Sequence, residues 1–135
     1  MLTRCNNVKG VIGLLDWFSL PEGYLLVMER PTPCIDLFDF IQKQKYLDEN
    51  LAKYLFSQIV STILDCTKLC VLHRDIKDEN ILLELNTGRI KLIDFGAATL
   101  LKKNRYQDFQ STRLYCPPGE REEINSNKFT YYLNN

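Results

Sequence analysis

The chain lacks several features that would assign it to a class of protein at once. No apolar run approaches the ~18 residues of a membrane span, and the N-terminus has no apolar segment of a signal peptide. Basic and acidic residues both number 17, so the formal net charge is zero. No excess positive charge is present to attract nucleic acid or a membrane surface. We therefore expect an intracellular protein, cytoplasmic or nuclear, that binds neither nucleic acid nor membranes.

The number and spacing of the cysteines argue against a disulfide framework and against a zinc site. There are five, an odd number, and none forms a C-x-x-C pair. This usage favours free thiols in a reducing compartment over a disulfide framework or a zinc site. The 135 residues are 45% hydrophobic and 25% charged, without internal repeats, which is typical of one globular domain.

The hydrophobic pattern predicts a mixture of strands and helices. Two strands are expected at about residues 12–18 and 24–29, with Trp17 and Phe18 in the core. A short helix is expected within residues 35–44. Beyond residue 96 the chain loses its periodicity and is expected to form a long loop.

The clearest element is a long helix from Leu51 to Cys70, with Asp48 as its N-cap. Its apolar residues follow i, i+3, i+4 spacing, which predicts one buried stripe. They are Leu51, Tyr54, Leu55, Ile59, Ile63 and Cys66.

The segment "HRDIKDEN", residues 73–80, sets five charged side chains and an asparagine between apolar runs. Downstream, "ILLEL" and "RIKLI" flank Asn-Thr-Gly, which is a strong hairpin signal. A hairpin centred near Thr87 pairs residues whose numbers sum to about 174, and a bulge would shift this register by one. Asn80 and Asp94 should therefore meet at its open end.

An amide oxygen and a carboxylate brought together suit Mg²⁺, which takes few protein ligands and completes its shell with phosphates and water. Asn80 and Asp94 are thus the candidate metal ligands. Asp75, in the same loop, could accept a proton from a substrate hydroxyl, and Lys77 could offset phosphate charge. His73, the only histidine, is expected to be a packed structural residue.

"HRDIKDEN" followed by "DFG" resembles the catalytic loop and the metal-binding motif of eukaryotic protein kinases. "MERPTPCIDLFDFI", "VLHRDIKDENILLELNTGRIKLIDFGAATLLK" and "STRLYCPP" are also similar to the Pim subfamily of serine/threonine kinases. The resemblance covers roughly residues 8–118. It implies an α+β fold that comprises the end of the N-lobe sheet, the hinge, the first C-lobe helices, the catalytic loop, the DFG hairpin and the activation segment.

The resemblance assigns roles to individual residues. Asp75 resembles the catalytic base, Lys77 the lysine that neutralises the γ-phosphate, and Asn80 and Asp94 the Mg²⁺ ligands. The implied cofactors are ATP and Mg²⁺, and the implied partners are protein substrates rich in arginine or lysine. Glu29, Arg30 and Pro31 match the hinge beside the adenine, and Asp36 resembles a residue near the ribose. Asp36, Asp39 and Glu79 could also form an acidic rim for basic peptides. In the substrate loop, Thr112 is expected to hydrogen-bond toward Asp75 and Lys77, and Asp108 is expected to pair with Arg74.

The chain departs from the kinase pattern in ways that leave two functions open. None of its six glycines fits G-x-G-x-x-G, and no strand lysine or helix glutamate of the N-lobe type is present. We therefore expect residues 1–118 to form a partial kinase domain that also lacks most of the helical C-lobe, followed by a divergent, disordered tail at 119–135. The chain is expected to be monomeric, and either an active kinase or an inactive remnant or pseudokinase that acts by binding.

Without the large C-lobe helices, the stripe of the long helix is expected to be largely exposed. Each large apolar side chain left in water lacks roughly 1.5–3 kcal/mol of the stabilisation that its burial would give. Several such losses are serious against a net stability of ~5–15 kcal/mol.

Overall fold

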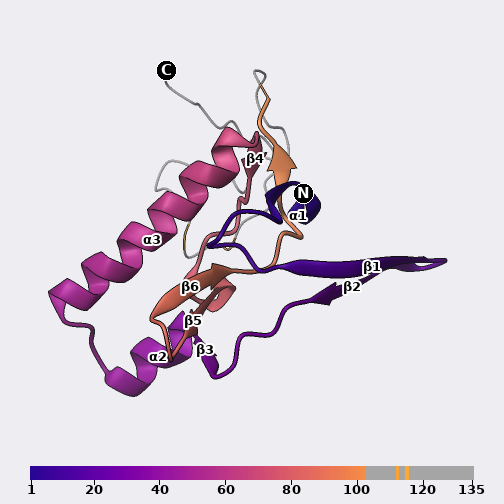
Figure 1. Cartoon of the computed structure of the whole chain (residues 1–135). Helices are drawn as coiled ribbons and strands as arrows, with labels where there is room; N and C mark the ends of the chain where they lie inside the picture. Colours follow the sequence, from indigo (N-terminus) through magenta and orange to yellow (C-terminus); the bar gives the residue numbers. More distant parts are fainter. Residues whose placement is uncertain (103–111, 113–114, 116–135) are drawn as a thin grey trace.

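The computed structural model describes residues 1–102, Thr112 and Tyr115. Within them the predicted α+β fold is confirmed: the chain forms three small antiparallel sheets and one long helix, and two of the sheets contact that helix (Figure 1). The predicted boundary at residue 118, the tail of residues 119–135 and Asp108 lie outside the described residues. The elements are α1 (Leu2–Cys5), β1 (Leu14–Leu20), β2 (Gly23–Met28), β3 (Cys34–Asp36), α2 (Leu37–Gln44), α3 (Glu49–Lys68), β4 (Val71–Leu72), the 3-10 helix η1 (Asp78–Asn80), β5 (Ile81–Glu84), β6 (Arg89–Leu92) and β7 (Thr99–Leu100).

The long helix α3 begins where the sequence predicted. Oδ1 of Asp48 accepts the backbone N–H groups of Asn50 and Leu51, each at 3.0 Å, and so caps two of the unpaired donors of the first turn. The predicted hairpin is also present, since β5 and β6 pair antiparallel. Strand β3, which the sequence did not predict, pairs with the other edge of β5.

Two buried clusters form the core, and Phe95 packs against both of them. The first joins α1 and the following loop to the end of α3 and to β4; it consists of Leu2, Cys5, Val8, Val11, Ile12, Cys66 and Val71. The second joins α2 and α3 to the alternating inward residues of the β5–β6 hairpin; it consists of Leu37, Leu55, Ile81, Leu83, Ile90 and Leu92.

The loop after α1 connects the two clusters. Its backbone pairs with β6, because Ile12 N donates to Leu92 O at 3.0 Å and Leu92 N donates to Gly10 O at 2.7 Å. A side chain at Gly10 would place its Cβ 1.8 Å from Oγ1 of Thr62 on α3. Glycine is therefore required for this loop to approach the helix.

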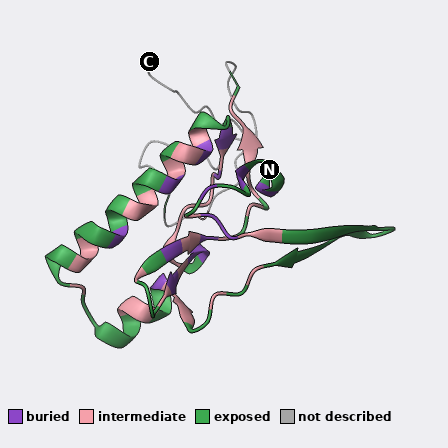
Figure 2. Ribbon diagram, viewed as in Figure 1, coloured by how far each residue is buried: buried purple, intermediate pink, exposed green. Residues whose placement is uncertain are grey.

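The hairpin β1–β2 extends away from the rest of the molecule as an arm (Figures 1 and 2). The prediction that Trp17 and Phe18 are core residues is wrong, because they are 52% and 49% exposed. Every residue of β1 and β2 except Leu14 is exposed, so neither face of this hairpin is covered in the described part of the chain. The ring of Trp17 meets the ring of Tyr24, its diagonal neighbour on β2, edge-on at a centroid distance of 5.9 Å.

The expectation that α3 exposes its predicted stripe is mostly wrong. Leu55 and Cys66 are buried and Ile59 is half-buried, because the core clusters cover this face of the helix; Tyr54 is exposed. The exposed apolar residues belong instead to a second stripe, Phe56, Val60 and Leu64, at intervals of four. Helix α3 thus carries apolar residues on two faces and buries one of them (Figure 2).

Two further expectations concern membranes and thiols. No helix in the described part of the chain is long and apolar enough to cross a membrane. The cysteines at positions 5, 34, 66 and 70 are free thiols, as predicted. Burial, and then its contact with Cys5, raises the pKa of Cys66 to about 12, so this thiol acts as a packing group.

Candidate active site

The charged segment of residues 73–80 forms the loop between β4 and β5 and ends in η1. His73 anchors its start: the ring is 5% exposed, and Nε2 lies 2.9 Å from Ile93 O. Nδ1 accepts the backbone N–H of Asp75 at 3.3 Å, so these partners assign the proton to Nε2. Burial lowers the pKa of His73. The prediction of a structural histidine is confirmed.

Asp75 lies where three other residues of the site converge. Its Oδ1 accepts the hydroxyl of Thr112 at 2.8 Å and the backbone N–H of Thr112 at 3.2 Å. Its Oδ2 accepts Nδ2 of Asn80 at 3.0 Å and lies 3.4 Å from Nζ of Lys77. Burial alone would raise the pKa of Asp75, but the Thr112 bonds, the Lys77 charge and the Asn80 amide together lower it. The carboxylate is therefore ionised at neutral pH and able to accept a proton.

Lys77 and Thr112 complete this arrangement. Nζ of Lys77 donates to Oγ1 of Thr112 at 2.9 Å, so Thr112 contacts both the carboxylate and the ammonium group. The predicted hydrogen bonds of Thr112 toward Asp75 and Lys77 are thus confirmed. They join residues 35 and 37 positions apart in the sequence.

The β5–β6 hairpin brings Asn80 close to the start of the DFG segment. Ile81 pairs with Leu92, so Asn80 faces Ile93, and Ile93 N donates to Asn80 O at 2.9 Å. The register therefore differs by one residue from the predicted centre, within the stated uncertainty, and Asp94 follows one residue beyond the pair. Their joint contact with one cation remains a prediction.

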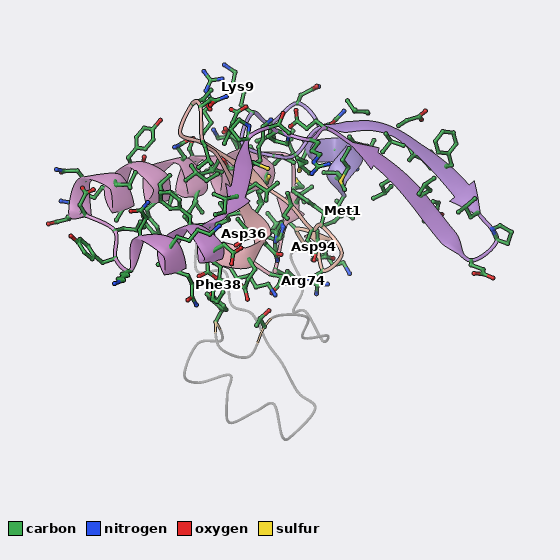
Figure 3. All side chains as sticks on the ribbon, turned by 90° about the horizontal axis from the view of Figure 1, so that it is seen from below. Met1, Lys9, Asp36, Phe38, Arg74 and Asp94 are labelled. Carbon is green, nitrogen blue, oxygen red and sulfur yellow. The ribbon has the colours of Figure 1, made fainter. Side chains whose placement is uncertain are left out.

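Asp94 and Arg74 both adopt left-handed backbone conformations, with φ of 59° and 68°. Such conformations cost side-chain-bearing residues about 1–3 kcal/mol and cluster at functional sites. Nε of Arg74 donates to Ala97 O at 2.7 Å, which ties the two segments together. Figure 3 shows Arg74 and Asp94 toward one side of the molecule and Lys9 on the opposite side.

Gly96 allows the Asp94 carboxylate to fold back onto its own turn. Oδ1 of Asp94 accepts the backbone N–H of Gly96 at 3.1 Å, and a Cβ at position 96 would lie 3.0 Å from that oxygen. Any larger residue would therefore push the carboxylate away.

The donor set fits Mg²⁺ better than a transition metal. No group of three or more His, Cys, Asp or Glu within residues 1–102, 112 and 115 is placed to hold a metal ion. Asn80 uses its amide nitrogen for Asp75, so its amide oxygen would be the atom that binds a cation, and Asp94 would contribute its carboxylate. Two oxygen ligands completed by phosphate and water are typical of a Mg²⁺ site.

Comparison with known proteins identifies the family. Residues 1–132 match the family described as "Protein kinase domain". The chain belongs to the protein kinase family. Its members are transferases, and the relatives of this chain are serine/threonine kinases.

Two relatives illustrate the extent of the similarity. The chain is 61% identical over 118 residues to the Caenorhabditis elegans protein "Serine/threonine-protein kinase prk-2". The matched region covers 87% of this chain and 27% of that protein. It is 49% identical over 111 residues to "Serine/threonine-protein kinase pim-2" of Danio rerio, covering 82% and 36%. The chain thus spans about a third or less of the kinases it matches.

Two of the residues to which the resemblance gives roles, Glu29 and Asp36, have structural partners. The carboxylate of Glu29 lies 2.5 Å from Nζ of Lys91 and accepts the backbone N–H of Gly13 at 2.8 Å. Oδ1 of Asp36 caps helix α2 by accepting the N–H of Asp39 at 2.8 Å. These contacts occupy Oε1 of Glu29 and Oδ1 of Asp36, and the roles of both residues beside adenine and ribose remain predictions.

Two interactions of the described residues, Glu29–Lys91 and Tyr115–Asp78, were not predicted from the sequence. Lys91 alternates with inward-facing residues of β6, but nothing in the sequence indicates Glu29 as its partner. The hydroxyl of Tyr115 donates to Oδ1 of Asp78, which links the catalytic loop to a residue 37 positions away. No local pattern could have predicted that contact.

Proposed function

We propose that this chain acts as a Pim-like serine/threonine kinase that transfers the γ-phosphoryl group of ATP to a protein hydroxyl. The observation that carries the proposal is the convergence of Lys77, Asn80 and Thr112 on the carboxylate of Asp75. A carboxylate held in this way is positioned as a base, with a cation beside it. That arrangement supports phosphoryl transfer, which depends on positioning and charge stabilisation.

In the proposed reaction, the substrate hydroxyl oxygen bonds to the γ-phosphorus while the bond between that phosphorus and the ADP oxygen breaks. The hydroxyl proton passes to Asp75. Lys77 offsets the charge that develops on the transferred group. Mg²⁺, held by Asn80 and Asp94, would supply further neutralisation of the phosphate oxygens.

The proposed substrates are proteins rich in arginine or lysine. Helix α2 contacts η1, so the acidic residues at the start of α2 lie near those of the catalytic loop. Asp39 and Glu79 are exposed there, and Asp36 is half-buried. Charge complementarity to a basic peptide supports the substrate class.

A second candidate function is binding without catalysis. Its support is the absence of a G-x-G-x-x-G segment from the whole sequence, since that loop normally covers the ATP phosphates. An inactive kinase of this kind would use its surface for partner binding.

The test is phosphoryl transfer by purified residues 1–135. The chain would be incubated with Mg²⁺, γ-labelled ATP and an arginine-rich peptide, alongside the Asp75→Asn and Asp94→Asn variants. Removal of a general base typically costs about 100-fold or more in rate. Asp65→Asn is the matched control, because Asp65 is paired with Lys68 on the exposed end of α3.

Peptide labelling that both site variants abolish and the control retains would support the kinase. Binding of Mg·ATP without any transfer would support the inactive binder. Absence of both would overturn the catalytic proposal for this chain.

A further inference from the structure

The pair Tyr115–Asp78 is a contact of the catalytic loop to which the proposed chemistry gives no role. The phenol hydroxyl of Tyr115 donates to Oδ1 of Asp78. Tyr115 also donates its backbone N–H to Thr112 O at 2.9 Å. The two described residues of this segment are therefore linked to each other as well as to the loop.

Both residues are anchored on the same short loop. Thr112 is bound to Asp75 and Lys77, and Tyr115 is bound to Asp78, the next residue in the chain. Two anchors three residues apart fix the position of Thr112 more firmly than either anchor alone, because the second removes freedom of movement that the first leaves.

Asp78 is itself held in place. Its Oδ1 also accepts the backbone N–H of Glu79 at 3.2 Å, at the start of η1. The loop closes behind it, since Asn80 N donates to Lys77 O at 3.0 Å. The acceptor for Tyr115 is thus fixed relative to the proposed base and metal ligand.

Tyr115 is not a core residue, so its hydrogen bond to Asp78 can be removed without disturbing the packing of the core. Tyr115 is 46% exposed, so loss of its hydroxyl would not open a cavity. The hydrogen bond to Asp78 is the main cause that raises the pKa of Tyr115 to about 12, with burial and the charges of Asp78 and Glu79 adding to it. The phenol therefore keeps its proton, and remains a donor, at neutral pH.

We propose that the Tyr115–Asp78 hydrogen bond is a positioning latch that holds Thr112 against Asp75 and Lys77, and so shapes the place where the peptide hydroxyl binds. Tyr115 and Asp78 are positioning residues that act through Thr112 and do not touch the phosphate. The proposal rests on the proposed kinase function. Its consequence is that loss of the latch raises the KM for the peptide more than the KM for ATP.

The kinetic test compares Tyr115→Phe, Asp78→Ala, Asp78→Asn and the double variant Tyr115→Phe/Asp78→Ala. A hydrogen bond to a charged group corresponds to roughly a tenfold effect, so Tyr115→Phe and Asp78→Ala should each raise the peptide KM about tenfold and leave the ATP KM unchanged. Asp78→Asn retains an acceptor and should recover much of the loss. The double variant should be no worse than the worse single one. Tyr46→Phe is the control, since Tyr46 is 77% exposed.

Equal changes in the peptide and ATP parameters, or additive losses in the double variant, would overturn the latch. A second readout does not depend on catalysis: amide hydrogen exchange at Thr112 and Tyr115, measured by NMR. Exchange at both should accelerate in Tyr115→Phe relative to the wild-type chain and to Tyr46→Phe. Unchanged exchange overturns the latch whether or not the chain is active. If exchange accelerates but the chain transfers no phosphate, the kinase proposal is overturned, and so is the proposed effect of the latch on the peptide. The Tyr115–Asp78 hydrogen bond would still be supported as a structural contact.

Discussion

Nδ2 of Asn80 donates to two atoms of Asp75, its carbonyl oxygen at 2.9 Å and its carboxylate Oδ2 at 3.0 Å. One buried amide thus fixes both the backbone and the side chain of the proposed base. Asn80 is 6% exposed, so water cannot replace these bonds easily. The same amide has its oxygen left for a metal ion, which couples the placement of the base to the placement of the cation.

This relationship predicts the effect of Asn80→Asp. A second carboxylate would replace the donor and face Oδ2 of Asp75, so like charges and a lost hydrogen bond should lower the free energy of unfolding by about 2–3 kcal/mol at pH 7. Urea titration measures the change. Asn50→Asp, at the exposed start of α3, is the control and should shift stability by ~0.5 kcal/mol at most. Equal stabilities for wild type and Asn80→Asp would show that the amide is not oriented as described.

A second prediction concerns the ion pair between Glu29 and Lys91. The hydrogen bond from Lys91 is the largest influence on the pKa of Glu29 and lowers it; burial opposes this, and the Gly13 amide and the Lys91 charge lower it further. A lowered folded-state pKa gives stability that is present above the unfolded value of about 4.3 and is lost as the pH falls through the folded value. Because the pair is partly exposed, Glu29→Gln should cost about 1 kcal/mol at pH 7.

The measurement is urea unfolding of wild type and Glu29→Gln at pH 7 and near pH 3. The difference between them should largely disappear at the lower pH. Glu49→Gln removes the exposed i,i+4 pair with Lys53 and should change stability by about 0.5 kcal/mol or less. A Glu29→Gln deficit that is independent of pH would exclude the ion pair as its cause.

His73 gives a third prediction, in a different pH range. Burial lowers its pKa in the folded state, although the Ile93 carbonyl and the charges of Asp75 and Asp94 oppose the shift. Below the unfolded value of about 6.5 the unfolded chain binds the proton more readily, so stability should fall as the pH decreases from 7.5 to 5.5. His73 is the only histidine, so the pH dependence in this window should be lost in His73→Gln. The same slope in both proteins would contradict the assignment.

The single tryptophan provides a fourth prediction. Trp17 is 52% exposed on an uncovered hairpin, so its fluorescence in the native chain should be red-shifted and readily quenched by acrylamide. Quenching should differ little between native buffer and urea. Strong shielding of Trp17 in the native chain would show that another surface covers the arm.

Much of the fold could be predicted because local signals carry it. Asp48 caps α3 with its own side chain, and Asn-Thr-Gly sets the β5–β6 turn, so both elements are specified by adjacent residues. The proposed base, Asp75, and the proposed metal ligands, Asn80 and Asp94, lie in the segments that precede β5 and follow β6. The contact of Thr112 with Asp75 is long-range, and only the resemblance to kinases predicted it.

The errors have a common physical cause, which is that burial depends on neighbours outside the element. Trp17 and Phe18 have the β-propensity of core residues, yet no further strand or helix of the described chain covers them. Strand β3 is only three residues long and exists because β5 offers it an edge. The pair Tyr115–Asp78 depends on tertiary approach in the same way.

The proposed chemistry requires Asn80 and Asp94 to share one cation beside Asp75. The most direct measurement replaces Mg²⁺ by paramagnetic Mn²⁺ in the presence of ADP and follows the side-chain amide signal of Asn80 and the backbone signal of Asp94 by NMR. We predict that both signals broaden together, and that Asp94→Asn abolishes the broadening at Asn80. Sharp signals at both positions, or broadening at Asn80 that persists in Asp94→Asn, would contradict the shared site.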